Sequence, residues 1–146
     1  IPHTLNPPPA ATISRELVAL SDYLTPNETE LEVLAGQDGS NIEAAARSLL
    51  TTEQQTVIVT LGAQGAQWVN RGDTKLIPTF PVEVVDTTGA GDAFNGGFAV
   101  ALAEGKSLEE AVRFGNATAA LSVTRPGTAP SMPRRDEVDA LLISTK

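Results

Sequence analysis

The sequence predicts an α/β domain with a largely parallel sheet. Three observations carry this prediction. Short β-branched runs alternate with stretches of helical periodicity. The run 56–60, Thr-Val-Ile-Val-Thr, is almost wholly apolar, which is typical of a strand covered on both faces. A strand-like segment before Asp86 passes through a glycine-rich turn into a helix, so we expect ligands at the carboxyl ends of strands.

The first half of the chain predicts three strands and three helices. Asn27 precedes Glu30 at capping-box spacing, and Gly36 ends that helix. Asn41 is expected to cap the next helix in the same way. Strands are predicted at 1–6, 23–25 and 56–60, and helices at 13–20, 27–36 and 41–50.

The second half predicts a hairpin and three helices. Residues 67–70 and 75–77 alternate around Arg-Gly-Asp, whose glycine and aspartate tolerate positive φ. The segment 82–85 is expected to be the strand that leads into the glycine turn. Helices are predicted at 90–103, from Ser107 to 121 and from about Arg135 onward, with Gly105 ending the first of them.

Composition excludes several classes of function. Lys and Arg number 10 against 18 Asp and Glu, a net charge of −8, so a nucleic-acid partner is not expected. No apolar run approaches the roughly 18 residues that span a bilayer, so no membrane partner is expected either. The chain has no cysteine and one histidine, which disfavours zinc sites and Ser-His triads. The lack of cysteine fits a cytoplasmic location.

The start of the chain indicates a piece of a larger domain. It begins with Ile1 rather than methionine and runs at once into a strand-like segment. A chain of 146 residues can bury roughly 70% of its unfolded surface, so it can hold a core of its own. We therefore expect one compact part, residues 1–146, of a longer protein.

The strongest chemical signal is the turn Gly89-Ala90-Gly91-Asp92 at the start of a helix. Glycines let the backbone approach an anion, and the first N–H groups of a helix attract negative charge. Asp92 would repel a resting phosphate there. It is therefore predicted to act as the base that accepts a proton from an attacking hydroxyl. The alternative is a packed helix start with Asp92 as an ordinary dipole-stabilising acid.

Other candidates also have plain structural interpretations. Asn27 and Glu30 form a helix cap on that view, and Gly62 and Gly65 are simple turn residues after a buried strand. Asn116 is a poor helix former at a mid-helix position, where an exposed asparagine explains it equally well. Trp68, the only tryptophan, is predicted to pack in the hairpin rather than stack on a ligand.

Four segments together resemble the ribokinase family of carbohydrate kinases. Val-Asp-Thr-Thr-Gly-Ala-Gly-Asp, 85–92, resembles its C-terminal signature, and Asn-Glu-Thr-Glu, 27–30, its N-x-x-E element. Thr-Leu-Gly-Ala-Gln-Gly, 60–65, resembles its nucleotide-binding turn, and 113–131 resembles the helix and loop beside adenine and a monovalent cation. The match keeps the family's order. It implies the C-terminal half of a three-layer α/β/α, ribokinase-like fold.

The resemblance assigns roles to the motif residues. Asp92 would be the base and contact the sugar hydroxyl, with Gly89, Ala90 and Gly91 forming the anion hole. Asn27 and Glu30 would lie near Mg²⁺ and the phosphates. ATP contacts are implied at Asn27, Glu30, Thr60, Leu61, Gly62, Ala63, Gln64, Gly65, Gly91, Asp92 and Asn116.

A potassium site is implied by the same resemblance. Its oxygen ligands would be the Asp86 carboxylate, several backbone carbonyls and a hydroxyl, as suits a hard cation. The alternative for 122–131 is a Pro/Gly loop after a helix. The implied K⁺ ligands are Asp86, Thr88, Ser122, Arg125, Gly127 and Ser131.

The activity implied is transfer of a phosphoryl group from ATP to a pentose, D-ribose by preference, giving ribose 5-phosphate. A fructokinase or nucleoside kinase of the same family remains an alternative, as does a non-catalytic nucleotide-binding module. A Rossmann dehydrogenase is disfavoured because no G-x-G-x-x-G opens a helix. Family members are roughly twice as long by resemblance, so the N-terminal sugar-binding half and lid are expected elsewhere. The complete enzyme is expected to be a homodimer, and the isolated chain inactive.

Overall fold

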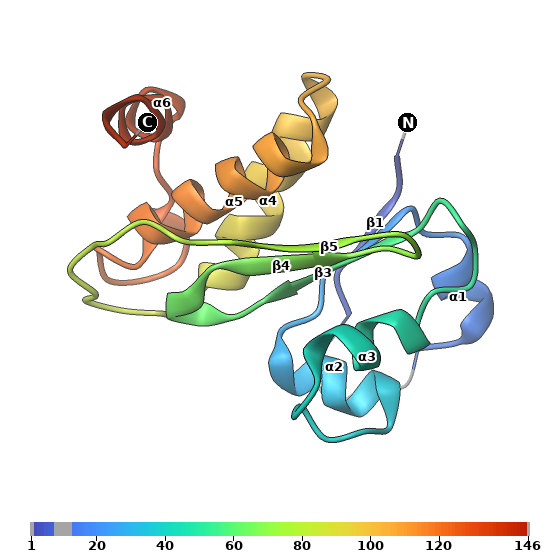
Figure 1. Ribbon diagram of the computed structural model, residues 1–146. Helices are drawn as coiled ribbons and strands as arrows, with labels where there is room; N and C mark the ends of the chain where they lie inside the picture. Colours follow the sequence, from blue (N-terminus) through green and yellow to red (C-terminus); the bar gives the residue numbers. More distant parts are fainter. Residues whose placement is uncertain (1, 8–12, 146) are drawn as a thin grey trace. The chain divides into compact units, whose positions relative to one another are not determined.

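The computed structural model describes residues 2–7 and 13–145. The chain forms two compact units, Ile1–Ile77 and Pro78–Lys146 (Figure 1). Ile1, at the start of the predicted strand 1–6, lies outside the described residues. The strand described there is short, Thr4–Leu5.

The first unit is built on one five-stranded sheet in the order β1-β2-β3-β4-β5 (Figure 1). Its first two pairings are parallel and its last two antiparallel, so the sheet is mixed. The antiparallel pairings belong to the hairpin that the sequence predicts. The strands are β1 Thr4–Leu5, β2 Tyr23–Leu24, β3 Thr56–Thr60, β4 Ala66–Val69 and β5 Thr74–Ile77.

Strand β3 is buried along most of its length, as its composition predicts. Val57 and Val59 lie in one apolar cluster with residues of α2 (Glu28–Ala35) and α3 (Ile42–Ser48). Ile58 points to the opposite face and is fully buried beside its register partner Trp68. Trp68 is 7% exposed, which confirms a packing role. Its buried indole N–H has no hydrogen-bond partner within the described residues.

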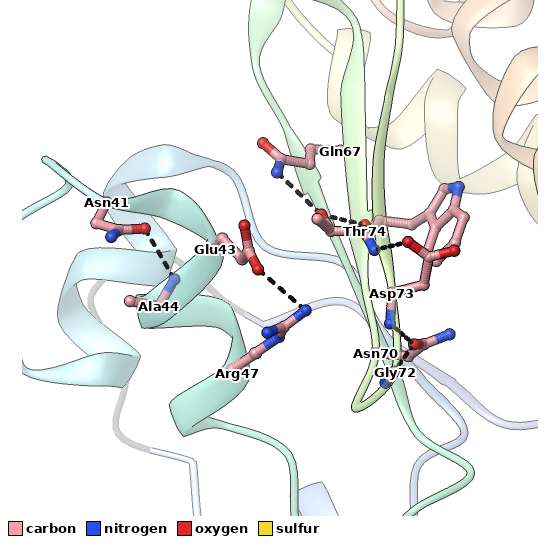
Figure 2. A network of polar contacts seen from close by, with 10 residues as sticks. Asn41, Glu43, Ala44, Arg47, Gln67, Asn70, Gly72, Asp73 and Thr74 are labelled. Atoms are coloured by element: carbon pink, nitrogen blue, oxygen red, sulfur yellow. Dashed lines mark hydrogen bonds and ion pairs between the residues drawn. The ribbon is translucent and has the colours of Figure 1, made fainter.

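The predicted caps set where α2 and α3 begin. The Asn27 side chain accepts a hydrogen bond from the Glu30 amide at 2.8 Å, and the Glu30 carboxylate accepts one from the Asn27 amide at 2.9 Å. This is a complete capping box. Asn41 accepts from the amide of Ala44 at 3.0 Å at the start of α3 (Figure 2). Polar groups at both helix starts are therefore satisfied locally.

The side chain of Asn70 helps to close the turn between β4 and β5. The Asn70 carbonyl oxygen accepts from the amides of Gly72, at 3.0 Å, and Asp73, at 2.7 Å (Figure 2). The Asn70 amide also donates to the Asp73 carbonyl at 3.0 Å, so side-chain and backbone bonds close the turn together. The hairpin forms at the predicted positions within one residue.

Gln55, at the entry to β3, is a buried polar hub in the first unit. Its amide nitrogen donates to the carbonyls of Val18 and Ser21, at 2.6 and 2.9 Å. Its oxygen accepts from Thr51 and Thr52 in the preceding loop. These bonds tie the end of α1 (Arg15–Ala19) to the loop that precedes β3.

The second unit consists of α4 (Ala90–Ala103), α5 (Leu108–Ser122) and α6 (Arg135–Ser144), as the sequence predicts. Helices α4 and α5 lie side by side (Figure 1). They can pack closely because glycines lie at their contact. A Cβ on Gly97 would lie 2.3 Å from the Thr118 hydroxyl, and one on Gly115 would lie 2.8 Å from the Phe94 ring. Each glycine therefore removes a clash between the helices.

The predicted strand at 82–85 is wrong. The described residues 81–85 form no strand, and Val84 and Val85 are 59% and 60% exposed. The amides of Val85 and Asp86 both donate to one carbonyl, that of Val123 at the end of α5. A strand needs a neighbouring ladder of backbone groups, and this segment meets a helix end instead.

Within the described residues, no helix combines the length and apolar character needed to cross a bilayer.

Candidate active site

The first unit brings two of the predicted nucleotide-binding elements together. Thr60, at the carboxyl end of β3, forms an isolated parallel bridge with Asn27. The Thr60 amide donates to the Pro26 carbonyl at 3.0 Å. Asn27 and Glu30 therefore lie beside the segment 60–65, at the sheet edge where ligands bind in α/β folds.

The segment after β3 is a tight glycine turn. Gly62 and Gly65 have φ of 55° and 108°, a backbone region that side chains disfavour. Leu61, Ala63 and Gln64 complete the turn, which contains the 3₁₀ helix Gly62–Gln64. The Leu61 amide donates to the Gly65 carbonyl at 2.8 Å. The two glycines therefore have the structural role of turn residues.

The second unit contains the turn 86–92 at the start of α4. Gly89 is the N-cap, with a left-handed φ of 78° and no capping side chain. The Ala90 amide donates to the Thr87 carbonyl at 3.2 Å. The amides of Gly89, Gly91 and Asp92 donate to no acceptor in the part of the chain that the structure describes. These free N–H groups and the helix dipole favour a bound anion.

Asp92 is the third residue of α4 and is exposed. Its carboxylate makes no hydrogen bond or ion pair with any described residue. The acid is thus free to accept a proton from a ligand. The ordinary alternative, an acid that stabilises the helix dipole, fits the same position.

Asp86 links the turn to the loop after α5. One carboxylate oxygen accepts from the Thr88 amide at 2.9 Å, and the other accepts from the Gly127 amide at 3.0 Å. A hydrogen bond from the Thr88 side chain and these two amides lower the pKa of Asp86 to about 2. The carboxylate is therefore ionised at neutral pH and lies beside two of the predicted cation ligands.

The loop 122–131 contains four of the predicted K⁺ ligands, and hydrogen bonds within the loop hold its backbone. Ser131 is fully buried, and its hydroxyl donates to the Thr128 carbonyl at 2.6 Å. The Ser122 carbonyl accepts weakly from the Arg125 amide at 3.4 Å. The carbonyls of Thr88, Arg125 and Gly127 accept no hydrogen bond from described residues. Carbonyl and carboxylate oxygens are the ligand types that suit a hard cation.

The structure contradicts one of the two interpretations of Asn116, that of a plain exposed asparagine. It is 3% exposed within α5, so the description as a plain exposed asparagine is wrong. Its side-chain amide donates to the Pro78 carbonyl at 3.3 Å. Burial with a backbone partner explains why this residue is accepted within the helix.

Two residues that the sequence analysis did not assign lie against the turn and its loop. The Thr128 side chain packs against Gly89, where a Cβ would lie 3.1 Å from the Thr128 methyl carbon. Glu137 of α6 pairs with the Arg125 guanidinium and accepts from the Arg134 amide. Glu137 follows Arg134 at capping spacing, but no sequence signal indicates its contact with Arg125, 12 residues away.

The predicted site residues thus form two groups. Asn27, Glu30 and the turn 60–65 lie together in the first unit, and the turn 86–92 lies with the loop 122–131 in the second. No group of three or more His, Cys, Asp or Glu gathers among the described residues as a metal cage would require. A glycine turn with free amides, an unpaired acid and an oxygen-lined loop is an arrangement for handling a phosphorylated ligand.

Comparison with known proteins identifies the class. Residues 1–135 match the pfkB family carbohydrate kinase model, so the chain belongs to the pfkB family of carbohydrate kinases. Its relatives include a ribokinase from Haemophilus influenzae, 46% identical over 136 residues, which are 91% of this chain and 44% of the relative.

Solved ribokinase structures match the fold as well. The ribokinase from Thermotoga maritima is 50% identical with a TM-score of 0.89, over 96% of this chain and 48% of that one. The Arabidopsis thaliana ribokinase, solved with ribose and ATP, is 39% identical with a TM-score of 0.87, over 97% of this chain and 47% of that one. The predicted family and the ribokinase-like α/β fold are confirmed. The chain spans less than half the length of these relatives.

Proposed function

We propose that this chain is the nucleotide-binding part of an ATP-dependent sugar kinase that phosphorylates D-ribose at its 5-hydroxyl. The proposal draws on the similarity to ribokinases, one of them solved with ribose and ATP. The observation that carries it is the Asp92 carboxylate, unpaired among the described residues, in a helix start where the amides of Gly89, Gly91 and Asp92 are also free. An anion and a proton acceptor are both needed there for phosphoryl transfer.

The turn supplies two functions in this reaction. The free amides of Gly89, Gly91 and Asp92 donate to the oxygens of the transferring phosphoryl group, where charge is held in the transition state. The 5-hydroxyl oxygen forms a bond to the γ-phosphorus of ATP, the bond to ADP breaks, and the hydroxyl proton passes to Asp92. In a loose transition state this proton leaves late, so the position of Asp92 matters more than its basicity.

Asn27 and Glu30 are proposed to face Mg²⁺ and the phosphates. One oxygen of Glu30 accepts from the Asn27 amide, and a carboxylate has further lone pairs for waters of the ion. The two residues thus fit Mg²⁺ held mainly by phosphates and water. The turn 60–65 and Asn116 are proposed to contact the nucleotide.

The loop 122–131 and Asp86 fit K⁺. The three free carbonyls and the ionised carboxylate described above are hard oxygen donors. Asp86, Thr88, Ser122, Arg125, Gly127 and Ser131 would hold the ion. A bound cation would add positive charge near the glycine turn, and these residues would keep it away from the reacting atoms.

The test is turnover of the complete protein with ATP and a panel of sugars that includes D-ribose, 2-deoxyribose and fructose. D-ribose is expected to give the highest kcat/KM. Asp92→Asn removes the proton acceptor with little change in size, so kcat is expected to fall by about 10²–10⁴-fold. ATP affinity is expected to hold or rise, because a negative charge beside the phosphates is lost.

Asp136→Asn is the matched control, since Asp136 also lies in the first turn of a helix. Its kcat is expected to stay within about twofold of the wild type, as is usual for exposed substitutions. Near-normal turnover of Asp92→Asn would contradict the role of Asp92. Preference for fructose would leave the kinase class intact and overturn the ribose assignment.

A further inference from the structure

The carboxylate of Glu137 joins the two ends of the loop 125–134. One of its oxygens pairs with the Arg125 guanidinium, and the other accepts from the Arg134 amide at 2.7 Å. The side chains of Arg125 and Glu137 are 35% and 31% exposed, so both are largely shielded from water. Such a charge-assisted contact holds its partners more firmly than a fully exposed ion pair.

Between these ends, the loop touches the glycine turn at two points. The Gly127 amide donates to Asp86 at 3.0 Å, and Thr128 fills the space beside Gly89. The amide and the hydroxyl of buried Ser131 both donate to the Thr128 carbonyl, at 3.1 Å and 2.6 Å. The loop conformation and the position of the turn are therefore linked by direct contacts.

We propose that Glu137 is a positioning residue that keeps the loop 125–134 in contact with the turn 86–92. It acts through Gly127 and Thr128 and touches no reactant itself. The inference rests on the proposed function, because it assigns to that turn the binding of the phosphoryl group. Freeing one loop end adds conformations to the loop. The turn amides and the loop carbonyls then lose their shared geometry, and a displacement of about 1 Å can cost about 10²-fold in rate.

A purely local role for Glu137 is the competing explanation. Its bond to the Arg134 amide caps α6, and its loss would fray that helix alone. Two variants separate the roles. Glu137→Gln weakens both contacts, whereas Arg125→Met removes the ion pair and leaves the α6 cap in place. Asp136→Asn removes a neighbouring charge whose ion-pair partner among the described residues is exposed Arg134, and it is the matched control.

The experiment is hydrogen exchange by mass spectrometry on the complete protein, with peptides that cover 86–92, 125–131 and 135–144. In Glu137→Gln and Arg125→Met, exchange in the first two segments is expected to be about 3–10-fold faster. The K⁺ concentration for half-maximal activity should rise by about 3–10-fold, with the KM for the sugar unchanged. Asp136→Asn should move neither quantity.

Faster exchange confined to 135–144, or wild-type exchange at 86–92 in Arg125→Met, would overturn the proposal. The exchange result does not depend on catalysis. A wild-type protein that phosphorylates no sugar would therefore refute the proposed function, while the exchange pattern would still decide the role of Glu137. An unchanged K⁺ requirement with faster exchange would refute the link to the cation loop.

Discussion

Alanine is expected to stabilise the protein at Gly96 of α4 but not at the adjacent Gly97. A Cβ on Gly97 would lie 2.3 Å from the Thr118 hydroxyl, 2.8 Å from the Thr118 Cβ and 3.2 Å from the Phe114 carbonyl. Rotating Thr118 relieves only the first of these contacts, so the backbones of α4 and α5 must separate. A Cβ on Gly96, which is exposed, would meet nothing within 4 Å.

The magnitudes follow from two effects. Alanine is favoured over glycine inside a helix by about 1 kcal/mol, and this gain applies to both positions. Overpacking costs about 1–3 kcal/mol and applies to Gly97 alone. Gly96→Ala is therefore expected to stabilise the protein by about 1 kcal/mol. Gly97→Ala should be about 1–3 kcal/mol less stable than Gly96→Ala.

Urea unfolding of the complete protein, followed by far-UV circular dichroism, measures this difference. The comparison of midpoints is valid where the two variants share one m-value. Equal stabilities for Gly96→Ala and Gly97→Ala would show that α4 and α5 are not in close contact at Gly97. The packing described for the second unit would then be wrong.

Two further predictions concern polar groups with several partners. Gln55→Leu removes the hydrogen bonds that Gln55 makes to buried backbone groups. The free energy of unfolding, measured with urea, should therefore fall by about 2–4 kcal/mol. Gln54→Leu, at an exposed neighbour, should change it by less than about 0.5 kcal/mol, and equal effects would contradict the hub. The pKa of Asp86 is lowered to about 2 from an ordinary value near ~3.9, so its stabilising contribution is present above about pH 4 and is lost as the pH falls towards 2. Urea midpoints should therefore separate wild type from Asp86→Asn at pH 6 and converge near pH 2, and a constant gap would refute the role of the carboxylate.

The helices were predictable because their ends are marked locally. Ser107, where the helix was predicted to begin, accepts from the Glu110 amide, and Glu110 accepts from the Ser107 amide. Glycine and capping residues likewise predict the bounds of α4 and α5 to within one residue. These signals lie within a few residues of the feature that they mark, so one sequence is enough.

The failures concern contacts between residues far apart in the chain. The valines at 82, 84 and 85 have strand propensity, but the backbone partner of Val85 is the carbonyl of Val123. The contacts of Thr128 with Gly89 and of Glu137 with Arg125 likewise depend on how α4, α5 and α6 pack. Local pattern contains no information on those distances. The position of the glycine turn at the start of α4 was predictable, whereas the contacts that hold the turn in place were not.

The bond between Asp86 and Gly127 also bears on how the protein folds. It joins residues 41 positions apart, and the whole of α4 and α5 lies between them. Closing so long a loop is entropically costly unless the two helices have already paired. We therefore expect the pairing of α4 and α5 to precede the assembly of the turn 86–92. Partly folded chains would then lack the folded turn, so the phosphate binding proposed for it would arise only late in folding.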